Sequence, residues 1–227
     1  MEDMEKNYYF PRKSEFFAQF EEFNEIIKKL ISQKYGKEFA DRVAYEIKNE
    51  FKSIYEQIPY IGGDGNPLTL DLVASAMDLA VYLVLKNHGK KLDDTGKIVY
   101  KASEELFKIH PEPADLATNP KYIPYMKMGA DKSLERKYSE DWVYSFIHGN
   151  NDFDFGIDFT ECGIKKLFHK FDADEFTPYL CAMDRIMSKT ANAGLHRTET
   201  LAEGGNKCNF RYKKGRRTKV LNTVIEE

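Results

Sequence analysis

Three cysteines lie in the last third of this sequence, at Cys162, Cys181 and Cys208. A thiolate is a nucleophile, and a carboxylate near it can activate water or move a proton. An isolated cysteine is also one of the residues most often buried in a core, so simple packing is the alternative interpretation of each.

A carboxylate and an arginine are expected close to one of these cysteines. Cys181 and Asp184 stand three residues apart in a predicted helix, so their side chains share one face. Arg197 and Glu199 fall on the side of a predicted strand that should face the helices, and a guanidinium buried there needs a partner. Asp184 can pair with Arg197, either as a structural salt bridge or as part of a small-molecule site.

A zinc site is the third interpretation of the cysteines, with His169 or His196 as a further ligand. The spacings are long, and no Cys-x2-Cys pair anchors such a site. We therefore expect no bound metal and no cofactor.

The spacing of apolar residues changes along the chain, from helical in the first half to a period of two near residue 142. It predicts helices over residues 14–35, 39–58 and 69–86 and from 93 or 94 onward, then an irregular proline-rich connector over 110–129. Strands over 142–147 and 153–160, helices over 164–171 and 177–190, and strands over 195–202 and 207–212 follow. This order predicts an α+β fold, in which an N-terminal helical layer precedes a four-stranded antiparallel sheet (β-β-α-α-β-β) covered by helices. We expect residues 1–130 and 131–227 to form one integrated domain, with the site in the second part.

The register of the last hairpin follows if the turn at residues 203–206 is tight, because Ala202 then pairs with Lys207. In that register Leu201 faces Cys208, Glu199 faces Phe210 and Arg197 faces Tyr212, all on one side of the sheet.

The glycine-rich loop 61–67 (IGGDGNP) invites comparison with phosphate-binding loops. Those motifs continue with Lys and then Ser or Thr, which are absent here. We interpret the loop as an interhelical turn.

The composition excludes several classes of function. The apolar fraction is 42%, and 34 basic residues nearly balance 37 acidic ones, for a net charge of −3. Such a chain can pack a hydrophobic core, but it has no net positive charge that would attract nucleic acid or anionic lipid. The apolar run 68–85 contains Asp71, Ser75 and Asp78, which favours burial in protein over a membrane span. The basic run 213–217 is interpreted as a solvated tail.

We therefore expect a cytoplasmic protein with a small-molecule substrate and with no nucleic-acid or membrane partner. A homodimer is an assembly that the sequence allows.

Three C-terminal segments resemble the signature of the 2-amino-thiazoline-4-carboxylate hydrolase family: FDFGIDFTECGI (153–164), TPYLCAMD (177–184) and HRTETLAEGGNKCNFRY (196–212). Each contains one of the cysteines, and residues 58–89 are similar to the N-terminal half of that family. The last hairpin is also similar to the end of the four-vinyl-reductase domain, which binds small molecules in bacterial sensors.

The resemblance implies a cofactor-independent hydrolase that opens L-2-amino-thiazoline-4-carboxylate to N-carbamoyl-L-cysteine, on a route to cysteine. A cysteine would be the nucleophile, or a carboxylate would activate water. The candidate catalytic residues are Cys162, Cys208, Asp184, Asp158 and Glu199. Arg197 would bind the substrate carboxylate, and the further candidate substrate contacts are Thr160, Cys181 and Thr200. The alternative is a non-catalytic sensor or carrier domain that holds a heterocyclic ligand in the same pocket.

Overall fold

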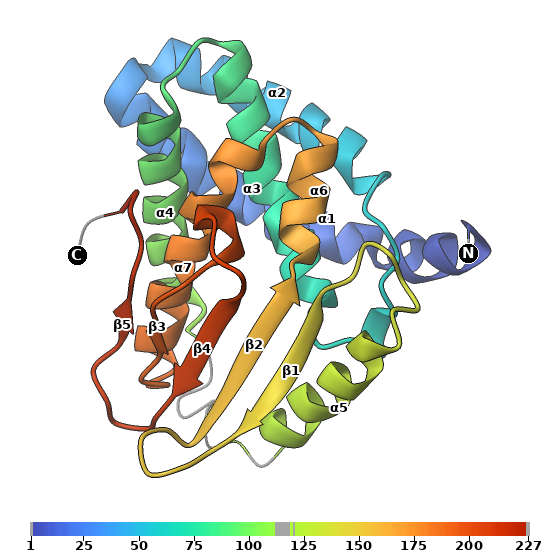
Figure 1. The fold of residues 1–227 in the computed structure, drawn as a ribbon. Coiled ribbons are helices and arrows are strands. Elements are labelled where there is room, and N and C mark those ends of the chain that lie inside the picture. The colour runs from blue at the N-terminus through green and yellow to red at the C-terminus, as the bar shows by residue number, and fades with distance from the viewer. Residues whose placement is uncertain (1, 112–118, 120, 226–227) are drawn as a thin grey trace.

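The computed structural model describes residues 2–111, 119 and 121–225, and its helices are stacked on one sheet (Figure 1). The N-terminal layer consists of α1 (Glu2–Tyr35), α2 (Lys37–Tyr55), α3 (Thr69–Asn87) and α4 (Leu92–Ile109). Helix α6 (Gly163–Lys170) packs on α3, and α7 (Thr177–Thr190) packs on α4, so the later helices join this layer to the sheet. The predicted α+β fold is confirmed.

Helix α1 begins well before Ser14, where the sequence predicted its start, and it contains Pro11. Tertiary contacts explain the longer helix. The side chains of Tyr8 and Tyr9 are buried, and the Tyr9 hydroxyl donates to the carbonyl of Pro59 across 3.0 Å. Burial of this kind outweighs the weak local signals that mark a helix start.

Helix α3 is the apolar run of the sequence, and protein surrounds it on nearly all sides. Its Ser75 hydroxyl donates to the carbonyl of Leu72, 2.8 Å away, and its Asp78 is 8% exposed. Burial raises the pKa of the Asp78 carboxyl to about 8. Among the described residues, no helix combines the length and the apolar character that a membrane span requires.

Helix α7 has the bounds that the sequence predicted, with Pro178 in its first turn. It packs against α4 at Gly96, where an added Cβ would lie 2.0 Å from the Tyr179 ring. The close approach of these two helices therefore requires glycine at position 96.

The irregular connector predicted over residues 110–129 is wrong in its second half, because α5 (Tyr122–Leu134) is a helix. Pro124 lies in its first turn, where backbone N–H groups have no acceptor within the helix, so a proline is tolerated there. Residues 112–118 and 120 of the same stretch lie outside the described residues.

The sheet has five strands in the order β1-β2-β4-β3-β5, not the four that were expected. They are β1 (Val143–His148), β2 (Phe155–Glu161), β3 (His196–Arg197), β4 (Cys208–Tyr212) and β5 (Lys219–Val220). The first four pair antiparallel as predicted, and β5 adds a parallel edge beside β3. The two residues of β5 are too short a run for an alternating pattern to reveal them.

The register of the last hairpin differs by two residues from the prediction, because His196 pairs with Arg211. The Asn209 side chain causes the early end of β3, since its Oδ1 accepts the N–H groups of Thr198 and Glu199, both at 2.9 Å. A shift of two residues keeps every side chain on its expected face. Arg197 therefore still points to the helix-covered side, with Phe210 as its neighbour.

A candidate site between helix α7 and the sheet

The pair of Arg197 and Asp184 joins strand β3 to helix α7. The Arg197 guanidinium forms an ion pair with the Asp184 carboxylate. It also donates to the carbonyls of Cys181, at 2.9 Å, and Leu221, at 3.3 Å, and it lies 5.5 Å from the centre of the Phe210 ring. A buried cation needs partners of this kind. The Arg197 Nε has no hydrogen-bond partner among the described residues.

The two members of this pair differ in their access to solvent. The Arg197 side chain is 1% exposed, whereas the Asp184 side chain is 26% exposed. Burial raises the pKa of the Asp184 carboxyl to about 6, although Arg197 opposes the rise. A carboxyl with a pKa near neutrality can both accept and return a proton at physiological pH. Asp184, and not Arg197, is thus the member of the pair that a ligand can reach.

The three cysteines form an electrostatic cluster around Asp184. The Asp184 charge contributes to the raised pKa of each thiol, and Cys162 and Cys208 both add to the raised pKa of Cys181. Charges act on one another in this way only over short distances in a protein. The thiols come from three separate segments, which are the start of α6, the middle of α7 and strand β4.

The thiols are held in their protonated form, because burial is the largest cause of the raised pKa at all three. Cys208 is the most buried of them, its pKa rises to about 12, and its Sγ accepts the N–H of Leu201 at 3.2 Å. Cys162 caps helix α6, and its Sγ accepts the N–H of Lys165 at 3.5 Å. A helix N-terminus lowers a thiol pKa, but here burial outweighs that effect.

Aromatic residues of β4 form the sheet side of this site. Phe210 and Tyr212 share the helix-covered face with Cys208, and both keep part of their surface accessible. Burial raises the pKa of the Tyr212 hydroxyl well above its usual value, and the Asp184 charge adds to the rise. Tyr212 was not among the predicted site residues, although its alternation with Cys208 could have indicated it. The Leu221 carbonyl was also missed, because a backbone acceptor leaves no signal in the sequence.

The structure does not bring Asp158 and Thr160 to this cluster, because both lie on the opposite face of β2. Asp158 is 14% exposed and forms ion pairs with Lys207 and Arg211, both at 2.6 Å. These cations hold the pKa of the Asp158 carboxyl below its usual value. The Thr160 hydroxyl donates to the Val143 carbonyl at the edge of the hairpin.

Glu199 and Thr200 stabilise the turn before β4. Glu199 accepts the N–H of Asn206 at 2.6 Å. The Thr200 hydroxyl accepts the N–H of Glu203 and so caps a single 3-10 turn, Leu201–Glu203. Both side chains have a structural role here, and neither contacts the Arg197–Asp184 pair through a hydrogen bond in the described residues.

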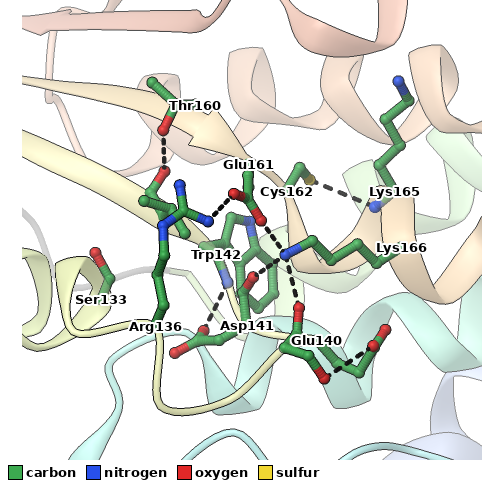
Figure 2. A network of polar contacts seen from close by, with 12 residues as sticks. Ser133, Arg136, Glu140, Asp141, Trp142, Thr160, Glu161, Cys162, Lys165 and Lys166 are labelled. Atoms are coloured by element: carbon green, nitrogen blue, oxygen red, sulfur yellow. Dashed lines mark hydrogen bonds and ion pairs between the residues drawn. The ribbon is translucent and has the colours of Figure 1, made fainter.

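A second polar network, which the sequence did not indicate, lies beside Cys162 (Figure 2). Glu161 forms ion pairs with both Arg136 and Lys166. Lys166 also donates to the carbonyls of Ser139 and Asp141, each at 2.8 Å. The network fixes the end of β2 and the start of α6, and therefore the position of Cys162.

In the described ranges, no three His, Cys, Asp or Glu side chains are grouped as ligands for a metal ion. In the basic run 213–217, Arg216 is used inside the fold, where it donates to the carbonyls of Gly194 and Arg211 at 3.0 and 2.5 Å.

These features define an α+β protein with a cluster of three cysteines, Asp184 and Arg197 between helix α7 and the sheet. The model of the family described as L-2-amino-thiazoline-4-carboxylic acid hydrolase matches residues 72–212, more than half of the chain. The chain belongs to this family, as its three C-terminal segments predicted. The match includes all three cysteines, Asp184 and Arg197. No curated protein and no solved structure matches the chain. The similarity to the four-vinyl-reductase domain stays a prediction.

Proposed function

We propose that this chain is a hydrolase that opens the ring of L-2-amino-thiazoline-4-carboxylate, or of a close analogue, to give N-carbamoyl-L-cysteine. The observation that carries the proposal is Asp184. Its carboxylate is accessible, buried Arg197 holds it in place, and its pKa is about 6. Membership of the hydrolase family supports the same reaction class.

In the proposed reaction, Asp184 acts as general base and then as general acid. Water adds to the amidine carbon of the ring and passes a proton to the Asp184 carboxylate. The carbon–sulfur bond then breaks, Asp184 returns its proton to the departing sulfur, and the second proton of the water moves to the ring nitrogen. The net change is the addition of one water molecule, which leaves a ureido group and a free thiol.

The raised pKa values of the thiols favour attack by water over a covalent route. A cysteine nucleophile must be a thiolate, and all three cysteines are held as thiols near neutral pH. The cysteines would instead line the site as weak hydrogen-bond donors to the substrate.

Arg197 is a positioning residue in this proposal and not the direct clamp of the substrate carboxylate that the sequence suggested. Its side chain is 1% exposed, and its donors already serve Asp184 and two carbonyls. Its role is to fix the orientation of the Asp184 carboxylate and to limit the rise of its pKa.

Incubation of the purified protein with the thiazoline acid tests the proposal. Loss of substrate and appearance of free thiol are followed together, with Asp184→Asn and Asp158→Asn as matched variants. Turnover that is lost in Asp184→Asn and kept in Asp158→Asn is the expected result. No turnover by the folded wild type, or full turnover by Asp184→Asn, would contradict it.

A non-catalytic binding domain is the second candidate function. It is favoured by the pairing of Arg197 within the protein and by the accessible aromatic surface of Phe210 and Tyr212. Such a domain would bind the thiazoline acid without releasing thiol, so the same incubation, combined with a binding measurement, separates the two candidates.

A further inference from the structure

A pocket of about 270 Å³ lies between the glycine-rich loop 61–66 and the C-terminal end of helix α5. We call it the basic pocket. None of the three cysteines lines it. Its polar lining includes Asn66, Lys132, Glu135, Arg136 and Asp141, and the last two also belong to the network in Figure 2.

The loop side of the basic pocket is fixed by Asn66. The side-chain amide donates to the Ile61 carbonyl at 2.6 Å and to Asp141 at 2.8 Å, and its oxygen accepts the N–H of Leu68 at 2.9 Å. Gly62 has a φ of 118°, which favours glycine. The pocket wall is therefore held in shape without a ligand, which lowers the cost of binding one.

The helix side of the basic pocket supplies positive charge. In the described part of the chain, Lys132 and Lys137 have no carboxylate partner, and the Lys132 amine makes only a long contact, 3.4 Å, with the Gly65 carbonyl. Arg136 shares Glu161 with Lys166. A carboxylate entering the pocket would meet two ammonium groups that no carboxylate of the described residues neutralises.

Asp141 supplies the opposite charge from the inner side of the basic pocket. Its two oxygens accept the N–H of Trp142, at 2.7 Å, and the Asn66 amide. Each carboxylate oxygen can accept a second hydrogen bond. Burial raises the pKa of this carboxyl, so a cation beside it would relieve an unfavourable charge.

We propose that the basic pocket binds a free α-amino acid, with the ligand carboxylate toward Lys132 and Lys137 and the ligand ammonium toward Asp141. The pocket is smaller than the roughly 300–1,000 Å³ of sites for drug-sized ligands, which suits a molecule of this size. A simple anion such as phosphate fits less well, because Asp141 and Glu135 would repel it. This inference does not depend on the proposed hydrolase activity.

Equilibrium dialysis of the whole chain against the common L-amino acids, one at a time, tests the proposal without any turnover. At least one of them should bind, and both Asp141→Asn and Lys132→Met should weaken that binding about ten-fold or more, the effect of losing a charged hydrogen bond. Lys127→Met, an exposed substitution on the same helix, is the matched control and should bind as the wild type does. Acetate and phosphate should bind more weakly than the amino acid.

The proposal would be overturned by no binding of any amino acid, or by binding that Lys132→Met leaves unchanged. Binding that is lost in Asp184→Asn would also overturn it, since that loss would place the ligand in the other site. Lys132 is exposed, so its variant should fold even if Asp141→Asn does not. Tighter binding of phosphate than of any amino acid would also contradict the assignment.

Discussion

Arg197 is almost fully buried, and it holds a carboxylate, that of Asp184, which solvent still reaches. The arginine cannot meet a ligand without rearrangement, but it controls the group that can. The two partners of this salt bridge therefore have different roles. Arg197 fixes the position of the carboxylate, and Asp184 is the group that can react with a ligand.

Asp184→Asn should reduce kcat at least about a hundred-fold, because removal of a general base costs roughly that much. In the wild type, kcat/KM should fall as the pH drops through about 6, where the carboxyl becomes protonated and can no longer accept a proton. Initial rates over a pH series measure both effects. A rate that stays constant from pH 7 to well below 6 would rule out Asp184 as the base.

Arg197→Lys should lower kcat more than it raises KM. The lysine keeps the charge but cannot serve Asp184, Cys181 and Leu221 together. Weaker contact with the cation should raise the pKa of Asp184, so the acid limb of the rate profile should move to higher pH. A direct substrate clamp would give another pattern, a higher KM with the acid limb unmoved, and a purely structural arginine would lower only the melting temperature.

The cysteines should react slowly with iodoacetamide at neutral pH, because burial raises the pKa of each thiol. Cys181 and Cys208, whose pKa values rise furthest, should react more slowly than Cys162. Mass spectrometry of the alkylated protein over time measures the three rates. Cys162→Ser and Cys208→Ser variants should retain turnover, and rapid alkylation of one cysteine together with loss of activity would revive the covalent route.

Asp78→Asn should stabilise the fold at pH 7. The carboxyl has a pKa of about 8 in the folded chain and a much lower one when unfolded. The folded state therefore binds more protons between these values, and stability falls as the pH rises from about 4 to 8. The amide removes this penalty, so the free energy of unfolding at pH 7 should rise by at least about 1 kcal/mol. Urea unfolding at pH 4 and pH 7 measures it, and an equal effect at both values would contradict the explanation.

Much of the fold could be predicted from local patterns. Pro178 in its first turn indicates the start of α7, and the alternation of Phe155, Ile157 and Phe159 indicates β2. Helix α5 and strand β5 were missed for different reasons. Prolines obscured α5, and β5 depends on pairing with β3 across more than twenty residues, which no local pattern records.

The candidate site was predictable to the extent that it follows from side-chain periodicity. The sequence placed Asp184 on the helix face toward the sheet and Arg197 on the strand face toward the helices, so their contact could be predicted. The two-residue error in register did not change this result, because it kept each side chain on its face. Alternation along β2 also indicates that Asp158 and Thr160 lie on the face away from the helices. Both residues were nevertheless included in the predicted site, because they match the family resemblance. Packing of several segments determines that Asp184 is partly exposed and that Arg197 is buried. The same packing raises the pKa values of Asp184 and the three cysteines. No single segment of the sequence therefore indicates these properties.

The final residues of the described chain have a consequence for how the site is held together. The Leu221 carbonyl accepts from Arg197, and the Val220 and Ile225 carbonyls accept from the buried Arg185 of helix α7. A chain that ends at residue 212 already contains every cysteine and the whole family match, yet it lacks the Val220, Leu221 and Ile225 carbonyls. The last segment therefore completes the hydrogen bonding of two buried guanidiniums on either side of the contact between α7 and the sheet edge. Truncation or insertion beyond residue 212 should accordingly disturb the site, although no cysteine lies there.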